Sequence, residues 1–590
     1  MNRGSENLAR SFCRFAWRLH ERLSQERLHE EEKTLLFEVI EALFVSMDAG
    51  EVCLDLHCVK TQATIAEMES VLWRSKLASS NQANDILFVL DEAKRLYLHR
   101  FFHYEVTIAE RFKYLMTKTS EQESRDFHLS RLFPAFESEG SKDFQALAVA
   151  VAQMSPLSII SGGPGTGKTW TVVKILEALL LTNPKLRIAM CAPTGKAAAR
   201  MGESVRNNLQ GVDESVRHRI PTMASTVHRL IKQHRPLAYD VIVLDEASMV
   251  SLALMAELIE ATAESTRLIL LGDKDQLASV EPGAVFAELS QTFAFSPQKK
   301  EKLQALGFDS SVIKAANADC RSEQRWDLTD HTVWLTRSYR FDDQKGIGRL
   351  ARYVREGNAQ EAIDKLFEDD ELVRFMSLKP TSERLPDSVR DVVLRAYQPY
   401  FEAVRRYFDH RAQLSEVFAA LHRFGLLCAV NEGAFGIDTF NELIVASLSA
   451  DWGVHVEEHF PGEVIMVSVN DRDLQLNNGD VGVVLREADG RLMAYFETVD
   501  EMGSEGFRSI PVGRLPENKR AFALTIHKSQ GSEFDNVMLV LPTMSQLLTR
   551  ELLYTGVTRA KKSLTVVATS EAIRRAISTP TNRLSGLFSR

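Results

Sequence analysis

A run of glycines beside one lysine and one threonine is the part of this sequence whose chemistry is clearest. Residues Gly162-Gly-Pro-Gly-Thr-Gly-Lys-Thr169 follow an apolar run and precede a helical pattern. In that context backbone N–H groups of the glycines wrap phosphates, the lysine reaches the β- and γ-phosphates, and the threonine hydroxyl binds magnesium. The sequence therefore predicts a nucleoside triphosphate site formed by Gly162, Gly163, Pro164, Gly165, Thr166, Gly167, Lys168 and Thr169.

Two adjacent acidic residues supply what phosphate hydrolysis needs besides a phosphate cradle. The apolar run at residues 241–244 is followed directly by Asp245 and Glu246. In such sites one carboxylate holds magnesium and a neighbouring carboxylate polarises the attacking water. We therefore predict that Asp245 and Thr169 hold the metal ion and that Glu246 acts on the water.

Three further polar residues are candidates for contact with the γ-phosphate. Gln276 follows another apolar run, where an amide can touch the γ-phosphate and report its hydrolysis. Phosphoryl transfer also needs a positive charge on the transition state, and Arg340 and Arg559 stand out for this role. Taken singly, each of the three is an ordinary turn residue or surface arginine, so the surrounding motifs must decide.

These side chains need a scaffold that brings them to one edge. The apolar runs are separated by stretches of helix length, which is typical of parallel sheet built from βαβ units. Polar residues at the carboxyl ends of such strands gather at one edge of the sheet. The runs read as strands lie at residues 158–161, 187–192, 241–244, 267–271, 537–541 and 564–567.

Two other parts of the chain lack this alternation of apolar strands and helices. Residues 1 to about 135 read as helical, with apolar residues at helical spacing in 33–44 and 86–102 and a stop signal at 48–50. At 463–496, short strands are punctuated by Asn-Gly and Asp-Gly turns, which favours a small β-barrel. We also read the polar stretch 296–330 as an insertion.

Length and composition agree with a large globular protein of several domains. The chain has 590 residues, 45% hydrophobic and 26% charged, and needs no metal or disulfide to support its cores. Its net charge is −9, unlike a protein that coats a polyanion over its whole surface, so any nucleic-acid contact must lie in a local channel. Its six cysteines are scattered, and Cys53 and Cys58 have no second pair to complete a zinc set.

The sequence also bears on where the protein works. Its first residues mix charges without the apolar segment of a secretion signal. No apolar run is long enough to span a bilayer. Scattered cysteines fit a reducing compartment. We therefore expect a cytoplasmic protein with no membrane partner.

The phosphate loop is one of a series of motifs in a fixed order. Together they resemble the motifs of the superfamily 1 DNA helicases, and within them the RecD-type helicases, the alpha chain of exodeoxyribonuclease V. The matching strings besides the phosphate loop are Gln145, Ala192-Pro-Thr-Gly-Lys-Ala-Ala-Ala-Arg200, Ser225-Thr-Val-His-Arg229, Asp245-Glu-Ala-Ser248, Gly272-Asp-Lys-Asp-Gln-Leu-Ala-Ser-Val280, Ser338-Tyr-Arg340, Thr525-Ile-His-Lys-Ser-Gln-Gly-Ser-Glu533 and Tyr554-Thr-Gly-Val-Thr-Arg-Ala560. The chain departs from the family pattern at Trp170, where a hydroxyl residue is usual, and at Gly556, where alanine is common.

The resemblance implies an α/β fold with two RecA-like parallel-sheet motor lobes. It places an N-terminal helical docking domain at residues 1–135, a first, ATP-binding lobe at 136–340 and a second lobe at 341–590. A small SH3-like β-barrel insertion is expected in the second lobe at about 455–520. ATP would lie between the two lobes.

The resemblance also implies roles for single residues. Gln145 would read the adenine edge and Gln276 would sense the γ-phosphate, while Arg340 and Arg559 would reach the same phosphate from the second lobe. Small hydroxyl and imidazole groups grip a single strand by its phosphates without choosing a base. The residues that match strand-facing motifs are Thr194, Thr226, His228, Thr525, His527 and Ser529.

The function implied is that of an ATP- and Mg²⁺-dependent 5′-to-3′ DNA helicase. It would unwind duplex ends for recombinational repair beside a beta chain, which holds a nuclease and an opposite motor, and a gamma chain. The string at 49–56 resembles the alpha-chain start that docks on the gamma chain. Two alternatives stay open: a freestanding helicase without nuclease partners, and a scaffold that keeps nucleotide only as a structural ligand.

Overall fold

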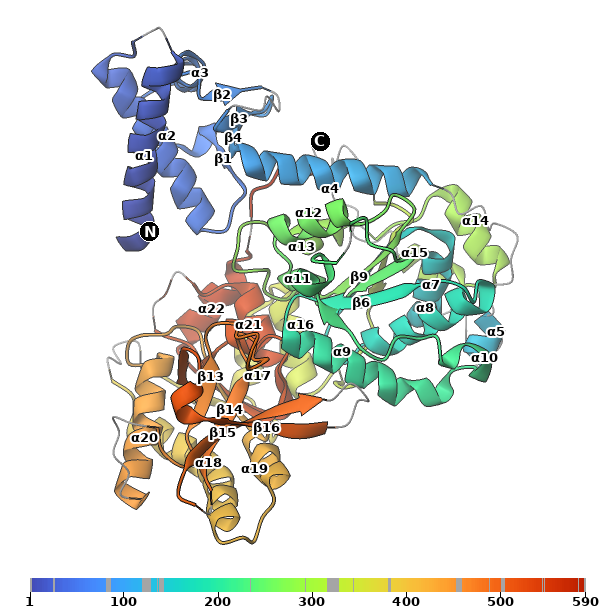
Figure 1. Cartoon of the computed structure of the whole chain (residues 1–590), viewed down its shortest axis with the longest axis vertical. Helices are drawn as coiled ribbons and strands as arrows, with labels where there is room; N and C mark the ends of the chain where they lie inside the picture. The colour runs from blue at the N-terminus through green and yellow to red at the C-terminus, as the bar shows by residue number, and fades with distance from the viewer. Residues whose placement is uncertain are drawn as a thin grey trace.

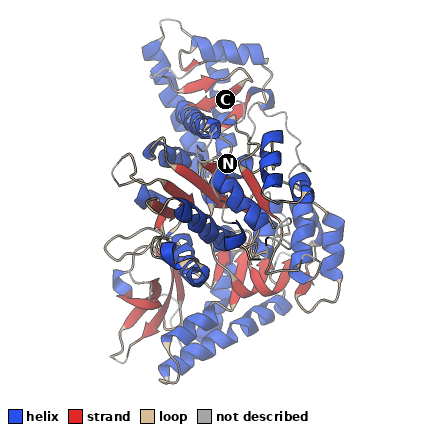
Figure 2. Ribbon diagram, turned by 90° about the vertical axis from the view of Figure 1, so that its right-hand side faces the viewer, coloured by secondary structure: helices blue, strands red, loops and turns tan. Residues whose placement is uncertain are grey.

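The computed structural model describes most of the chain, with short gaps. The described residues are 3–24, 27–80, 86–118, 129–134, 136, 143–233, 235–291, 293–315, 328–342, 344–379, 384–452, 459–487, 489–499, 505–543, 545, 547–581 and 583–587. In these ranges, no helix combines the length and the apolar character needed to cross a membrane. Parallel sheets flanked by helices dominate, so the chain is of the mixed α/β class (Figure 1, Figure 2).

The first parallel sheet carries the phosphate loop. Its strands are β5 (Leu157–Gly162), β6 (Ile188–Ala192), β7 (Ser225–Thr226), β8 (Val241–Leu244), β9 (Arg267–Gly272) and β10 (Thr332–Leu335), and its helices are α5 (Leu129–Leu132), α7 (Phe144–Met154), α8 (Lys168–Thr182), α9 (Gly195–Asn208), α10 (Glu214–Arg217), α11 (Val227–Leu230), α12 (Leu252–Ala261), α13 (Val285–Leu289), α14 (Pro297–Ala305) and α15 (Ser310–Ala315). The strand order is β10-β5-β9-β8-β6-β7, with all pairs parallel.

An apolar core covers each face of the first sheet, and for this reason its strands can be recognised as apolar runs in the sequence. Ile159 and Leu270 pack into the core that includes α12, whereas Ile160 and Ile269 face the opposite core with α7 and α8. A sheet covered on both faces needs strands that are apolar at nearly every position. The four strand runs predicted between residues 158 and 271 all lie in this sheet.

The second parallel sheet has its own core. Its strands are β11 (Val373–Ser377), β12 (Phe424–Cys428), β18 (Ala523–Thr525), β19 (Phe534–Val540) and β20 (Ala560–Ala568), with helices α16 (Gly346–Glu356), α17 (Ala359–Phe367), α18 (Asp387–Phe408), α19 (Leu414–Leu421), α20 (Ile437–Trp452), α21 (Arg550–Val557) and α22 (Ser570–Ser578). The order is β11-β20-β19-β12-β18. One continuous cluster of buried side chains joins these helices and strands, and Leu277, which follows β9 of the first sheet, also packs into it.

An antiparallel sheet is inserted between α20 and β18. Its strands are β13 (Val464–Val467), β14 (Val481–Arg486), β15 (Leu492–Val499), β16 (Glu505–Pro511) and β17 (Asn518–Arg520), in the order β16-β15-β14-β13-β17. Gly479 has φ +93°, as the Asn-Gly turn before β14 requires. The antiparallel strands fall where the small β-barrel was expected, and their closure into an SH3-like barrel stays a prediction.

The N-terminal region contains a sheet that the sequence analysis did not predict. Helices α1 (Arg3–Leu23), α2 (Glu30–Asp48), α3 (Ile65–Arg74) and α4 (His99–Thr117) surround strands β1 (Cys53–Asp55), β2 (Ala78–Ser79), β3 (Phe88–Leu90) and β4 (Arg95–Leu98), in the order β1-β4-β3-β2. The helix predicted over 86–102 is therefore wrong. Lys94, with φ +63°, turns β3 back into β4, and a helix begins only at His99.

The N-terminal region is packed on the first sheet. Helix α4 lies along α12, as Figure 1 shows at the top of the first sheet. Buried residues of the N-terminal region and of one face of the first sheet belong to one continuous apolar cluster. The two parts therefore share one continuous core.

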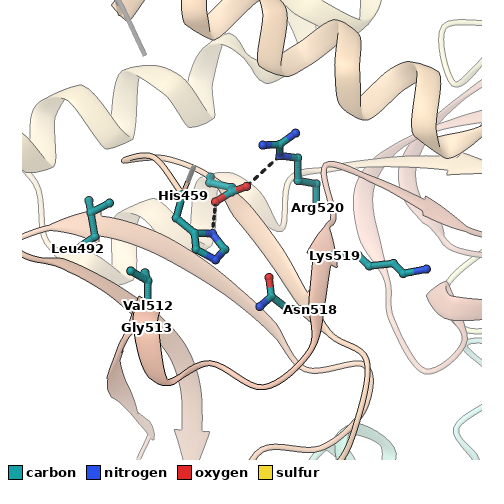
Figure 3. Close-up of a pocket in the computed structure, with 8 residues that line it drawn as sticks. His459, Leu492, Val512, Gly513, Asn518, Lys519 and Arg520 are labelled. Atoms are coloured by element: carbon teal, nitrogen blue, oxygen red, sulfur yellow. Dashed lines mark hydrogen bonds and ion pairs between the residues drawn. The ribbon is translucent and has the colours of Figure 1, made fainter. Parts of the chain in front are cut away.

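A charged cluster lies beside the inserted antiparallel sheet. Glu463 has a side chain only 3% exposed, and its two carboxylate oxygens accept from His459 Nδ1 at 2.6 Å and from Arg520 Nε at 3.0 Å (Figure 3). These side chains border a cavity of about 530 Å³ that Lys519 also lines. Two cationic partners satisfy the buried carboxylate, which would otherwise be costly to remove from water.

This cluster makes stability depend on pH in one direction. The hydrogen bond to Glu463 raises the pKa of His459 above its ordinary value of 6.5. The stabilisation is therefore fully present below about pH 6.5 and is lost as pH rises through the higher folded pKa. We expect His459→Gln to cost about 1 kcal/mol at pH 6, by urea denaturation, and less at pH 8. His218→Gln, at an exposed position, is the control, and a cost for His459→Gln that is equal at both pH values would contradict the prediction.

Candidate nucleotide-binding site

The phosphate loop joins β5 to α8 in a conformation that only glycine adopts without strain. Gly165 and Gly167 both have φ +78°. A Cβ at Gly165 would lie 2.4 Å from Cβ of Arg340, so there is no room for a side chain. Lys168 Nζ donates to the carbonyl of Gly162 at 2.6 Å, which keeps the ammonium inside the loop.

The acidic pair predicted to activate water lies at the end of β8, next but one to β5 in the sheet. Asp245 accepts from the backbone N–H of Glu246 at 2.8 Å. Burial, and then the charge of Glu246, raise the pKa of Asp245, while Lys168 opposes them. Glu246 has φ +50°, a left-handed conformation that is uncommon for glutamate and typical of functional positions.

Gln276 lies at the end of β9, between β5 and β8, and is held from two sides. Its Nε2 donates to Asp273 Oδ2 at 2.9 Å, and its Oε1 accepts from Arg559 Nη2 at 3.1 Å. Arg559 also donates to the carbonyls of Thr555 at 3.1 Å and Ser532 at 3.2 Å. Arg559 directly precedes β20 of the second sheet, so this bond crosses between the two sheets.

Arg340 does not come from the second sheet, contrary to the implication of the family resemblance. It follows β10 of the first sheet, and the preceding N–H, of Tyr339, donates to the carbonyl of Gly165 at 2.8 Å. This bond ties Arg340 to the phosphate loop. Its guanidinium reaches the half that contains the second sheet, because Nη1 pairs with Glu533 Oε1 at 2.7 Å. Glu533 directly precedes β19. We call the boundary between the two halves beside the nucleotide cavity the seam.

Glu533, the partner of Arg340 across the seam, is an acidic residue surrounded by cations. Burial raises its pKa, but the positive charges of Arg340, Arg200 and Lys561 outweigh burial and the pKa of Glu533 is lowered. A carboxylate that stays ionised among three cations neutralises part of their charge. The cations then remain near each other without a bound anion.

A cavity of about 490 Å³ brings the predicted residues together. The predicted residues that line it are Gly163, Pro164, Gly165, Thr166, Gly167, Lys168, Thr169, Asp245, Glu246, Gln276, Arg340 and Arg559. Its size is within the roughly 300–1,000 Å³ of small-molecule sites. A glycine cradle, an inward lysine and a buried carboxylate near a threonine fit a nucleoside triphosphate with a divalent cation.

Gln145 and Tyr339 lie at one end of the phosphate loop. Gln145, only 8% exposed, donates from Nε2 to the carbonyl of Thr166 at 3.1 Å. Its Oε1 accepts from the hydroxyl of Tyr339 at 3.4 Å, and the Tyr339 ring is 60% exposed. An exposed ring beside a glutamine amide can stack on a base whose edge the amide reads.

Two of the predicted strand-facing residues lie at the carboxyl ends of β6 and of its outer neighbour β7 in the first sheet. Thr194 comes after β6 and Thr226 ends β7, and these strands pair in parallel. Their hydroxyl groups accept from the N–H groups of Ala197 and Arg229, both at 3.2 Å. His228 is exposed near the same edge. These residues therefore lie on the β7 side of the sheet, away from β10.

The other three candidates lie at the end of β18, an outer strand of the second sheet, and just after it. Thr525 and His527 are half-buried, and burial lowers the pKa of His527, with Arg583 as the next cause. Ser529 differs, because it is 0% exposed and its hydroxyl donates to the carbonyl of Ile526 at 2.7 Å. In this conformation Ser529 does not reach the surface, which contradicts a direct strand contact by its side chain.

The two departures from the family pattern have packing explanations. The Trp170 ring meets Phe133 edge-on at 5.6 Å between centroids, so it fills the space beside the phosphate loop. A Cβ at Gly556 would lie 2.6 Å from Cδ1 of Leu539. Glycine is needed there because α21 packs closely on β19.

The comparisons with known proteins agree with these motifs. Residues 145–282 match the family described as an AAA domain, and residues 520–567 match the UvrD-like helicase C-terminal domain. RecBCD enzyme subunit RecD of Haemophilus influenzae is 35% identical over 89% of this chain and 84% of its own length. The same subunit of Mycolicibacterium smegmatis is 34% identical over 92% of this chain and 91% of its own length.

The chain belongs to the RecD family. A further relative, the ATP-dependent RecD2 DNA helicase of Deinococcus radiodurans, is 26% identical over 69% of this chain but only 46% of its own length. This RecD-family chain thus spans most of the length of the RecBCD subunits and less than half of RecD2.

Three residues of the site of this RecD-family chain were not predicted from the sequence. Asp273 is buried, and burial and Asp275 raise its pKa while Lys168 opposes them. The Tyr554 hydroxyl would lie 2.8 Å from a Cβ at Gly163. Asp273, Tyr339 and Tyr554 all stand inside the matched strings, but spacing alone does not reveal that they meet the phosphate loop.

Tyr339 gives a direct test of how the nucleotide base is held. Tyr339→Ala removes the ring beside Gln145 and is expected to raise the KM for ATP about tenfold, because base–aromatic stacking is worth about 1–3 kcal/mol. Tyr339→Phe keeps the ring and loses only a long hydrogen bond, so its KM should change less than about twofold. Steady-state hydrolysis of ATP, compared with hydrolysis of inorganic triphosphate, which has no base, checks this prediction. An unchanged KM for ATP in Tyr339→Ala would show that the ring does not contact the nucleotide base.

Proposed function

We propose that this chain is the alpha subunit of a RecBCD-type helicase and nuclease, exodeoxyribonuclease V, and works as an ATP-dependent DNA helicase motor. The observation that carries the proposal is the bond from Arg559 to Gln276 at the edge of the phosphate-loop cavity. Each half contributes one partner of this bond. Hydrolysis at the cavity therefore changes a contact that holds the two halves together.

Each residue that lines the cavity has a separate task in hydrolysis. Lys168 and the loop amides bind the β- and γ-phosphates, while Thr169 and Asp245 hold Mg²⁺. The bound ion supplies neutralisation of the developing phosphate charge. Glu246 orients and polarises the attacking water.

The remaining contacts sense and stabilise the γ-phosphate. Gln276, whose amide is fixed between Asp273 and Arg559, senses that phosphate. Arg340 and Arg559 stabilise its transition-state charge when they turn from their present acceptors. Gln145 reads the adenine edge.

DNA is gripped at the outer carboxyl edges of the two sheets. Thr194, Thr226 and His228 would hold the single strand on the first sheet, and Thr525 and His527 on the second. These edges lie on β7 and β18, at the end of each strand order. Alternate closure and opening of the seam then moves the strand between two grips, in the 5′-to-3′ direction.

The organisation we propose follows the predicted boundaries. Residues 136–340 and 341–590 are two RecA-like lobes, and residues 455–520 are an SH3-like insertion. Residues 1–135 dock on the gamma chain, with the beta chain completing the trimer that processes duplex ends in the cytoplasm. The sequence identities favour this subunit over a freestanding helicase, because two RecD subunits are 35% and 34% identical to this chain and RecD2 is 26% identical.

The phosphate loop and the partners are tested together with one variant. Lys168→Gln removes the charge that binds the phosphates, so ATP turnover should fall about a thousandfold or more, while co-purification with co-expressed beta and gamma chains is unchanged. Lys185→Gln, at an exposed position, is the control. Normal hydrolysis by Lys168→Gln would refute the site. A monodisperse, active wild-type chain that ignores both partner chains would favour the freestanding alternative.

The role of Arg559 is tested by separating binding from turnover. Arg559→Ala should leave the affinity for a fluorescent nucleotide within about threefold, because the phosphate loop is intact, yet lower strand-stimulated hydrolysis about a thousandfold. Arg575→Ala, on the exposed face of α22, serves as the matched change. If nucleotide titration and turnover are both unaltered in Arg559→Ala, Arg559 has no part in the reaction.

A further inference from the structure

The chain does not end beside the second sheet. After α22 it runs back to the first sheet and the N-terminal region, and Figure 1 shows this as the red segment that rises toward α4. We call residues 579–587 the C-terminal strap, of which 579–581 and 583–587 are described. Leu587 is 1% exposed and belongs to the core that the N-terminal region shares with the first sheet.

The start of the strap is fixed to the second half. The carbonyl of Thr579 accepts from the N–H of Arg550 at 3.0 Å. Thr581 donates to Glu551 Oε2 twice, from its N–H at 2.8 Å and from its hydroxyl at 2.6 Å. Arg550 and Glu551 begin α21, the helix that leads to Arg559.

Two residues further on, the strap is fixed to the first half. Arg583 Nη1 donates to the carbonyls of Glu281 at 3.1 Å and of Gly283 at 2.9 Å. A Cβ at Gly50, in the N-terminal region, would lie 2.9 Å from the Arg583 guanidinium, and Gly283 donates its N–H to the carbonyl of Gly50 at 3.0 Å. One arginine therefore sits where the first sheet and the N-terminal region meet.

The end of the strap is bound mostly to the N-terminal region. The carbonyl of Leu584 accepts from the N–H of Val52 at 3.0 Å, and Gly586 donates to the buried carboxylate of Glu105 at 2.8 Å. Ser585 donates to Glu288, on helix α13 beside the first sheet, at 2.7 Å. Burial raises the pKa of Glu288 to about 8.

The segment that Arg583 holds starts at the nucleotide site. Leu277 follows Gln276 directly, and its N–H donates to Thr555 Oγ1 at 3.0 Å. Its carbonyl accepts from Gln530 Nε2 at 2.8 Å. Residues 276–283 thus touch the γ-phosphate sensor at one end and Arg583 with Gly50 at the other.

We propose that the C-terminal strap transmits the state of the nucleotide site to the N-terminal region, with Arg583 as the positioning residue that holds residues 277–283. When Gln276 and Arg559 change partners on nucleotide binding, segment 277–283 shifts. Arg583 passes the shift to Gly50 and Val52, because it binds that segment beside both. The inference rests on nucleotide binding at the proposed site and adds a route from it to the region proposed to dock on the gamma chain.

Hydrogen exchange of the full-length chain tests the route. In the wild type a nonhydrolysable ATP analogue should slow amide exchange at residues 162–169 and alter exchange at residues 48–54 by about threefold. In Arg583→Ala the change at 48–54 should fall by about half or more, because only the direct bond from Gly283 to Gly50 is left, and the change at 162–169 should persist. Strand-stimulated kcat should fall about fivefold to tenfold with an unchanged KM for ATP, since the phosphate loop is untouched.

Matched variants separate positioning from stability. Arg583→Lys keeps a donor and should restore part of the response at 48–54, while Arg574→Ala, exposed on α22, should behave as the wild type. If Arg583→Ala does not fold, Ser585→Ala, which removes the bond to Glu288, must weaken the response. An undiminished response at 48–54 in the folded Arg583→Ala variant, or no response there in a wild type that still binds the analogue, overturns the proposal. No response at 162–169 in the wild type would instead refute the nucleotide site.

Discussion

One hydrogen bond, from the guanidinium of Arg559 to the amide of Gln276, explains how this structure can work as a motor. The two sheets have their own apolar cores, joined at the nucleotide cavity by Leu277 of the first half, which packs into the core of the second, so the seam there depends on this side chain and a few polar contacts. Three oxygens satisfy the buried Arg559, and burial still lowers its pKa. A bond to a charged donor is worth roughly 1.5–3 kcal/mol, which is small beside the binding energy of a triphosphate. A bound nucleotide can therefore open or close the seam without disturbing either core.

The cavity has one group of carboxylates that suits a bound cation and one group of cationic side chains that suits a bound anion. On the first sheet, burial and neighbouring carboxylates raise the pKa values of Asp245 and Asp273 around Lys168. Across the seam, Glu533 lies among Arg340, Arg200 and Lys561 and has a lowered pKa. A divalent cation would relieve the first cluster and a phosphate would recruit cations of the second. A metal ion would thus neutralise the carboxylates of the first sheet, and the triphosphate would neutralise the cations around Glu533.

Local sequence predicted the parts of the fold that have local causes. Buried parallel strands are apolar throughout, and the phosphate loop needs glycine at Gly165 and Gly167, so both were predictable. The segment 86–102 was not, because its apolar residues fit helical spacing, and only tertiary pairing of β3 with β4 selects strands. The burial of Ser529 and the tie of Arg340 to the phosphate loop also escaped prediction. Both depend on contacts between distant segments, which no spacing encodes.

The C-terminal strap constrains how the seam can open. Thr581 is bound to the second half and Arg583 to the first, with one residue between them. A chain spans at most about 3.6 Å per residue, so the Cα atoms of Thr581 and Arg583 stay within about 7 Å of each other, and only their side chains can add to the distance between the bonded groups of the two halves. The N-terminal region shares its core with the first sheet. While these bonds persist, we therefore expect the seam to open by rotation about the strap, with the largest displacement at the edges far from it.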